Sequence, residues 1–158
     1  MNKLRFRSGQ VHLRKVPVDA NTVIEAGDLV WLDGAIAKPA SDLDWQTDLA
    51  TTQSEFAARF LGVAHQPSKA GETAPISVDV SPDAVYEFDC NPTLYSLGQS
   101  LGVDANGSQL MNKQLEIANP VNSVARAAEF TDGPVSTLRV TFASAFYTGS
   151  SNASAALG

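Results

Sequence analysis

Closely spaced turns constrain this chain more than any other feature of its sequence. Residues rich in glycine, proline, aspartate and asparagine recur every ten to twenty positions, and β-branched and aromatic residues fill the short runs between them, as in 29–32, 60–64, 76–80 and 135–142. Runs of this kind between turn signals are typical of strands. The pattern predicts a mainly β fold of about eight to ten short strands, either a compact β-barrel or a β-sandwich-like domain.

Short sequence patterns predict the positions of two hairpins, a helix and a further strand. Asp33-Gly34 predicts a hairpin between residues 29–32 and 35–38, and the turn at 104–107 predicts a second hairpin. Residues 48–59 predict the one short α-helix, capped by Asp42 or Asp44. We further expect a chain break at Asn91-Pro92 and a short strand over 121–125.

Charge is distributed very unevenly along the chain. The first sixteen residues carry five basic residues and no acid, whereas the remainder carries six basic and all seventeen acidic residues. Lys3, Arg5 and Arg7 alternate with less polar residues, which predicts a strand with one basic face, and Gly9 marks a bend. One interpretation is a first strand with a solvated basic face, and the other is an extended arm that docks on an acidic neighbouring molecule. For the second, the candidate contact residues are Lys3, Leu4, Arg5, Phe6, Arg7, Val11, Leu13, Arg14 and Lys15.

These features predict one folded domain with two appendages. Residues 1–17 form the basic N-terminal arm, residues 18–147 a single β-rich domain, and residues 148–158 a C-terminal tail. The tail is almost entirely glycine, serine, alanine and asparagine, so it buries too little apolar area to offset its ordering entropy. We therefore expect it to be mobile.

No pattern for catalysis or for a cofactor stands out. Residues 98–102 match the Gly-x-Ser-x-Gly pattern of α/β-hydrolases, but turn residues follow Ser100 where that fold needs a helix, and both histidines precede it. His12, His65 and the single Cys90 are too dispersed for a zinc site. The acidic residues of 79–89 do not have calcium-loop spacing. We expect a protein that is not an enzyme and that uses no metal, cofactor or small-molecule substrate.

Composition also limits the kinds of partner that we expect for this protein. An acidic body argues against specific nucleic-acid binding, which needs clustered lysine and arginine. No apolar run is long enough to span a membrane, and no apolar segment follows the basic start, so we expect neither membrane insertion nor a signal peptide.

The order of several segments resembles a known family. After the basic arm come Val23–Val30, then a helix-like stretch ending in Phe60–Ala64, then Gly98–Val103, and finally a strand ending in Val140–Phe142. This order and spacing look like those of the capsid cement, or head-decoration, proteins of tailed bacteriophages and related prophages. The resemblance covers about residues 20–145 and rests on turn-plus-strand patterns.

The resemblance implies a non-enzymatic structural protein of the virion. Such a protein is made in the host cytoplasm, binds the outer surface of the capsid and stabilises it by bridging major capsid subunits, often as a homo-trimer whose N-terminal arms lie on neighbours. Removing residues 2–16 would then leave a folded protein that no longer binds capsids. The alternatives are another phage surface-assembly module of tail or fibre, a carbohydrate-binding β-domain and, more remotely, a small serine hydrolase that uses Ser100.

Overall fold

The computed structural model describes residues 3–155, so arm positions 1–2 and tail positions 156–158 lie outside the described residues. Five strands form a closed barrel in the order β7-β11-β10-β8-β9, and a short parallel pairing of β7 with β9 completes it. Their bounds are β7 Val85–Thr93, β8 Ser100–Asn106, β9 Gln109–Ile117, β10 Ala125–Ala127 and β11 Val135–Phe142. Strand β1, Phe6–Ser8, extends this sheet beyond β7.

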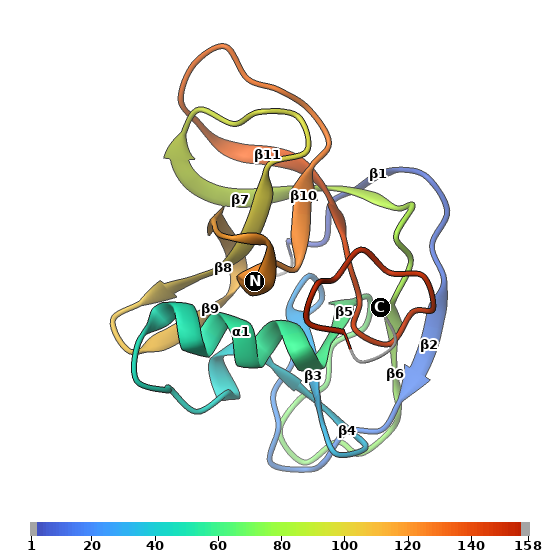
Figure 1. The fold of residues 1–158 in the computed structure, drawn as a ribbon. Helices are drawn as coiled ribbons and strands as arrows, with labels where there is room; N and C mark the ends of the chain where they lie inside the picture. Colours follow the sequence, from blue (N-terminus) through green and yellow to red (C-terminus); the bar gives the residue numbers. More distant parts are fainter. Residues whose placement is uncertain (1–2, 156–158) are drawn as a thin grey trace.

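A second sheet lies below the barrel in the view of Figure 1. Its order is β2-β6-β5-β3-β4, with bounds β2 Leu13–Val16, β3 Leu29–Asp33, β4 Ile36–Pro39, β5 Phe60–Ala64 and β6 Ile76–Asp79. The mainly β fold is thus confirmed. Of the two predicted architectures, the structure has the barrel, with a second sheet packed beside it.

The α-helix is confirmed, with a different cap from the one predicted. Helix α1 spans Leu49–Arg59, and the Asp48 carboxylate caps it by accepting a hydrogen bond from the Thr51 N–H. Asp42 instead ends the 3-10 turn η1, Ala40–Asp42, and Asp44 lies in the loop that follows. Asp48 is the effective cap because its oxygen lies within reach of an unpaired N–H of the first helical turn.

The two predicted hairpins are confirmed, and two other local predictions are wrong. The chain does not break at Asn91-Pro92, since β7 runs through to Thr93 and an irregularity in its pairing with β11 accommodates the proline. Residues 121–125 are not a strand. They fall across the 3-10 turn η2, Pro120–Asn122, and the start of β10.

One apolar core joins the barrel to the second sheet. Leu29, Trp31, Phe60 and Val63 from the second sheet pack in the same buried cluster as Leu138 of β11. A smaller cluster lies on the other side of the second sheet and consists of Val16, Val18, Ile24, Val30, Ala37, Leu61, Ala64, Ile76, Val78 and Val80. Cys90 is buried as a free thiol.

The described part of the tail lies against the domain. Asn152 is buried, and its side-chain amide donates to the carbonyl oxygens of Ala57 and Ala143, both at 2.9 Å. The Ser154 hydroxyl donates to the Val121 carbonyl at 2.7 Å. Composition could not reveal these contacts, because they depend on two amide donors and one hydroxyl meeting carbonyl groups from distant segments.

Candidate functional site

The basic half of the arm meets acids of its own chain. Lys3 and Arg5 form ion pairs with Asp89, at Nζ–Oδ2 2.6 Å and Nη2–Oδ1 2.8 Å, and Arg7 lies 3.5 Å from the Glu87 carboxylate. The arm cations and the β7 acids both recur at every second residue, and residues two apart in a strand lie on the same face of the sheet. The alternating cations of the arm therefore lie opposite the alternating acids of β7. Of the two interpretations of the sequence, one left these cations solvated and the other placed them on an acidic neighbouring molecule, whereas the structure pairs them with acids on β7 of the same subunit.

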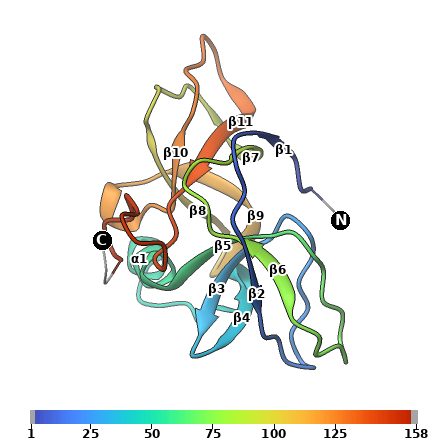
Figure 2. The ribbon, with the colours of Figure 1, turned by 90° about the vertical axis from the view of Figure 1, so that its right-hand side faces the viewer.

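The arm joins the two sheets along one side of the molecule (Figure 2). After β1 the chain bends at Gly9, as predicted, where a φ of 87° and the nearby Asp83 carbonyl oxygen leave no room for a side chain. Strand β2 then pairs with β6 from Leu13 to Val16. Each arm strand is the outermost of its sheet.

The remaining predicted contact residues are mostly at the surface. Phe6 and Leu13 are 40% and 44% exposed, and Arg14 and Lys15 are also exposed. Leu4 and Val11 are partly buried against the main core. The structure thus brings all nine residues onto one side of their own subunit and leaves the outer edges of two strands facing away from it.

A buried hydrogen-bonded chain holds the arm at its bend. The Asp79 carboxylate accepts from the Tyr86 hydroxyl at 2.5 Å and from the His12 backbone N–H at 2.9 Å, and the Tyr86 oxygen lies 2.6 Å from His65 Nε2. Burial raises the pKa of Tyr86 and lowers the pKa of His65. The arrangement connects both sheets to the arm and gives Asp79 a structural role that the sequence did not indicate.

The candidate nucleophile has the wrong surroundings. Ser100 is buried at the start of β8, so a strand follows it where the nucleophile elbow requires a helix. Within residues 3–155, no group of three or more His, Cys, Asp and Glu side chains is placed to hold a metal ion. Glu87 and Asp89, from the acidic segment, are engaged by the arm.

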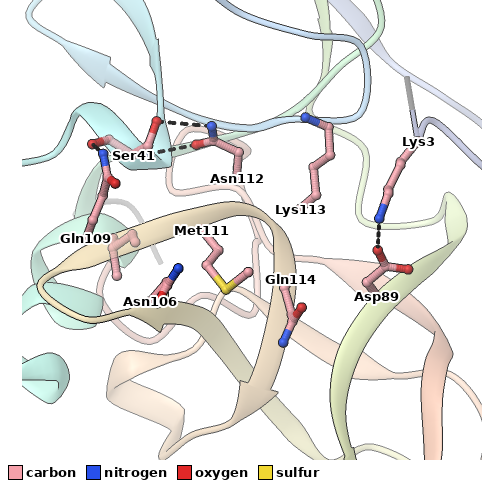
Figure 3. A pocket seen from close by; sticks show the side chains of 10 residues that line it. Lys3, Ser41, Asp89, Asn106, Gln109, Met111, Asn112, Lys113 and Gln114 are labelled. Atoms are coloured by element: carbon pink, nitrogen blue, oxygen red, sulfur yellow. Dashed lines mark hydrogen bonds and ion pairs between the residues drawn. The ribbon is translucent and has the colours of Figure 1, made fainter. Parts of the chain in front are cut away.

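A polar groove of about 330 Å³ runs along one edge of β9 (Figure 3). Four of its ten lining residues carry amide side chains, and several of these amides are already hydrogen-bonded. The Asn112 amide exchanges two hydrogen bonds with Ser41, and the Gln109 amide donates to the Ser41 carbonyl. The lining residues are Lys3, Ser41, Asp89, Asn106, Gln109, Leu110, Met111, Asn112, Lys113 and Gln114. This lining has no aromatic ring on which a sugar would stack, so the groove does not favour the carbohydrate alternative.

Two loops lie together at the far end of the barrel, at the top of Figure 1. The loop after β7 and the loop after β10 are joined by hydrogen bonds between Tyr95 and Thr131 in both directions, each 3.0 Å. They present Leu94, Leu97 and Phe130, which are 54%, 68% and 67% exposed. We name these three residues the loop tip.

Sequence reasoning missed the loop tip. Its only sequence signal is a few large apolar residues within otherwise polar turn segments, and any one of them alone is ordinary on a protein surface. Their significance comes from the pairing of two loops that lie more than thirty residues apart, as the bond between Tyr95 and Thr131 shows.

No helix among the described residues is long and apolar enough to cross a membrane. Comparison with known protein families finds no family that matches this chain, and comparison with curated proteins finds no matching relative.

Proposed function

We propose that this protein is a non-enzymatic structural component of a phage virion that binds the outer surface of the capsid and stabilises it by bridging major capsid subunits. The loop tip carries the proposal, because it is a surface suited to contact rather than to chemistry. The order of segments, which resembles that of capsid cement proteins, supports the choice of a capsid as the partner.

The loop tip has the properties of a contact surface. Its three large side chains are more than half exposed on two loops that are hydrogen-bonded to each other, and clusters of exposed apolar side chains mark interaction sites. Burying one such side chain completely is worth roughly 1.5–3 kcal/mol. Three of them supply a modest affinity, and a homo-trimer multiplies it because the second and third contacts form at high effective concentration.

The arm provides a second kind of contact in this proposal. Strands β1 and β2 are the outermost strands of their sheets, and an edge strand offers main-chain N–H and C=O groups to an added strand. Arg14 and Lys15 are exposed beside that edge and favour an acidic partner. The arm thus docks on its neighbour by its outer edge while it remains paired with its own subunit.

A paired-variant experiment tests the loop tip. Leu97→Asp combined with Phe130→Asp should reduce co-sedimentation with expanded capsids at least tenfold, since a charge at each position opposes desolvation. Val23→Asp is the matched control, because Val23 is 53% exposed but lies outside the loop tip. The shells should be assembled from the major capsid protein encoded beside this chain. Equal binding by the double variant, or a neighbourhood without a capsid gene, would refute the proposal.

Light scattering tests the oligomer independently. We expect the mass of a trimer at concentrations that saturate capsids. A strict monomer under those conditions would exclude avidity as the source of tight binding.

A further inference from the structure

Lys113 of β9 lies between two carboxylates from the turn that precedes β3. Its Nζ is 2.6 Å from Asp28 Oδ1 and 2.6 Å from Glu25 Oε1. The turn is fixed by its own hydrogen bonds, because the Asp28 N–H donates to the Glu25 carbonyl at 3.1 Å and the Glu25 N–H donates to Asp28 Oδ2 at 2.8 Å. The amine, the acid and a second carboxylate are therefore held in contact.

Burial makes this contact unlike a surface ion pair. The side chain of Asp28 is 2% exposed and that of Lys113 is 17% exposed, whereas that of Glu25 is 46% exposed. Removing two opposite charges from water is costly, and burial by itself disfavours the charged form of each group. Condensation to an amide removes both charges permanently.

We propose that Lys113 and Asp28 form an intramolecular isopeptide bond, with Glu25 carrying protons between them. Glu25 takes one proton from the Lys113 ammonium and delivers it to Asp28 Oδ1. The neutral amine then attacks the carboxyl carbon of Asp28, and a bond forms from Nζ to that carbon. Glu25 moves a second proton from the nitrogen to Oδ1, the bond from carbon to Oδ1 breaks, and one water leaves. Ammonium and carboxylate have become amide and water, and no oxidant or reductant is needed.

A backbone N–H stabilises the other carboxyl oxygen of Asp28, Oδ2, during the proposed reaction. Negative charge develops on Oδ2 when the amine adds, and the Glu25 N–H already donates to that atom. The two oxygens of Asp28 thus have different roles, with Oδ1 leaving beside the lysine and Oδ2 stabilised by the turn.

The shifted pKa of Asp28 favours the reaction, whereas the shifted pKa of Lys113 opposes it. Burial raises the pKa of Asp28, which favours the protonated acid that the reaction requires. The hydrogen bond from Lys113 lowers the pKa of Glu25 to about 2, and the two carboxylates together raise the pKa of Lys113 against the opposing effect of burial. Release of the amine proton is therefore the unfavourable part of the reaction.

Two other lysines of the chain also lie close to a carboxylate, and they serve as internal controls for the effect of distance alone. Lys3 lies 2.6 Å from Asp89 and Lys38 lies 2.8 Å from Asp33, yet these carboxyl side chains are 21% and 47% exposed. Among the described ion pairs, neither lysine contacts a second carboxylate. Distance alone would predict three crosslinks, whereas burial and the presence of a proton carrier predict one, at Lys113.

Mass spectrometry of the intact chain tests the proposal. After prolonged incubation of the folded protein we expect a loss of mass equal to one water, and a tryptic digest should yield a branched peptide joining Lys113 to Asp28 and uncut after Lys113. Because Cys90 is the only cysteine, the same product should run faster on a denaturing gel with or without reductant.

Three variants separate the proposed chemistry from other causes. Lys113→Arg keeps a cation but should abolish the loss of one water from the intact mass. Glu25→Gln should slow this loss of mass at least tenfold, and Lys38→Arg should leave its rate unchanged. Because Glu25 is half exposed, its variant should fold even if Lys113→Arg does not, and circular dichroism checks both. Full mass after prolonged incubation of the folded wild type, or a branched peptide at another lysine, would overturn the proposal.

Discussion

At the scale of single residues, Asp89 links the arm to the barrel by charge. Burial on its own would raise the pKa of Asp89, but hydrogen bonds from Lys3 and Arg5 outweigh it and lower the pKa. A carboxylate with a lowered pKa stabilises the fold above the ordinary aspartate value of about 4, and the contribution is lost as pH falls through the lowered value.

We therefore expect Asp89→Asn to cost about 1 kcal/mol in unfolding free energy at neutral pH, the size of a partly exposed ion pair with good geometry. The gap between wild type and variant should close as the pH falls below about 4. Urea titrations over this pH range measure it. Asp44→Asn is the control, since Asp44 is exposed and has no ion pair among the described residues. A gap that stays constant down to pH 2 would contradict the assignment.

At the scale of elements, the arm is part of the fold rather than an appendage to it. Strand β2 contributes Val16, which is 6% exposed, to the core of the second sheet, and it covers the edge of β6 with four residue pairs. Strand β1 covers β7 in the barrel sheet. The expectation that removing residues 2–16 leaves a folded protein therefore has to include a cost in stability.

Deleting residues 2–16 should consequently reduce the unfolding free energy by at least about 3 kcal/mol, because it removes a buried valine, several strand hydrogen bonds and the partners of Asp89. Thermal melting followed by circular dichroism measures the loss. The double variant Arg14→Gln, Lys15→Gln removes exposed charge from the same segment and should melt within a degree or two of wild type. An unchanged melting temperature for the deletion would show that the arm is independent.

At the scale of the whole molecule, the barrel and second sheet share one core. Leu138 of the barrel is 1% exposed in the cluster that includes Trp31 of the second sheet. We expect Leu138→Ala to lower stability by about 2–5 kcal/mol. Tryptophan fluorescence and far-ultraviolet circular dichroism should still report one coincident unfolding transition. Two separated transitions would mean that the sheets fold as independent units.

Local sequence patterns were enough to predict most of the strands and the helix. Alternation of two along residues 135–142 and 76–80, the Asp-Gly turn at 33–34 and the apolar run at 60–64 all depend on neighbours in the chain, and the structure has the corresponding strands at each place. The helix over Leu49–Arg59 follows from the same local reasoning. The bend at Gly9 was predictable too, because a break in alternation beside glycine needs no information from elsewhere.

The partners that these elements contact could be identified only from the folded chain. The arm's alternating cations were visible in the sequence, but only the placement of β7 beside β1 shows that Glu87 and Asp89 receive them. Likewise the loop tip, and the contact of Lys113 with Asp28, join segments far apart in the chain. Periodicity specifies the face on which a side chain lies, whereas the group opposite that face depends on how the whole chain closes on itself.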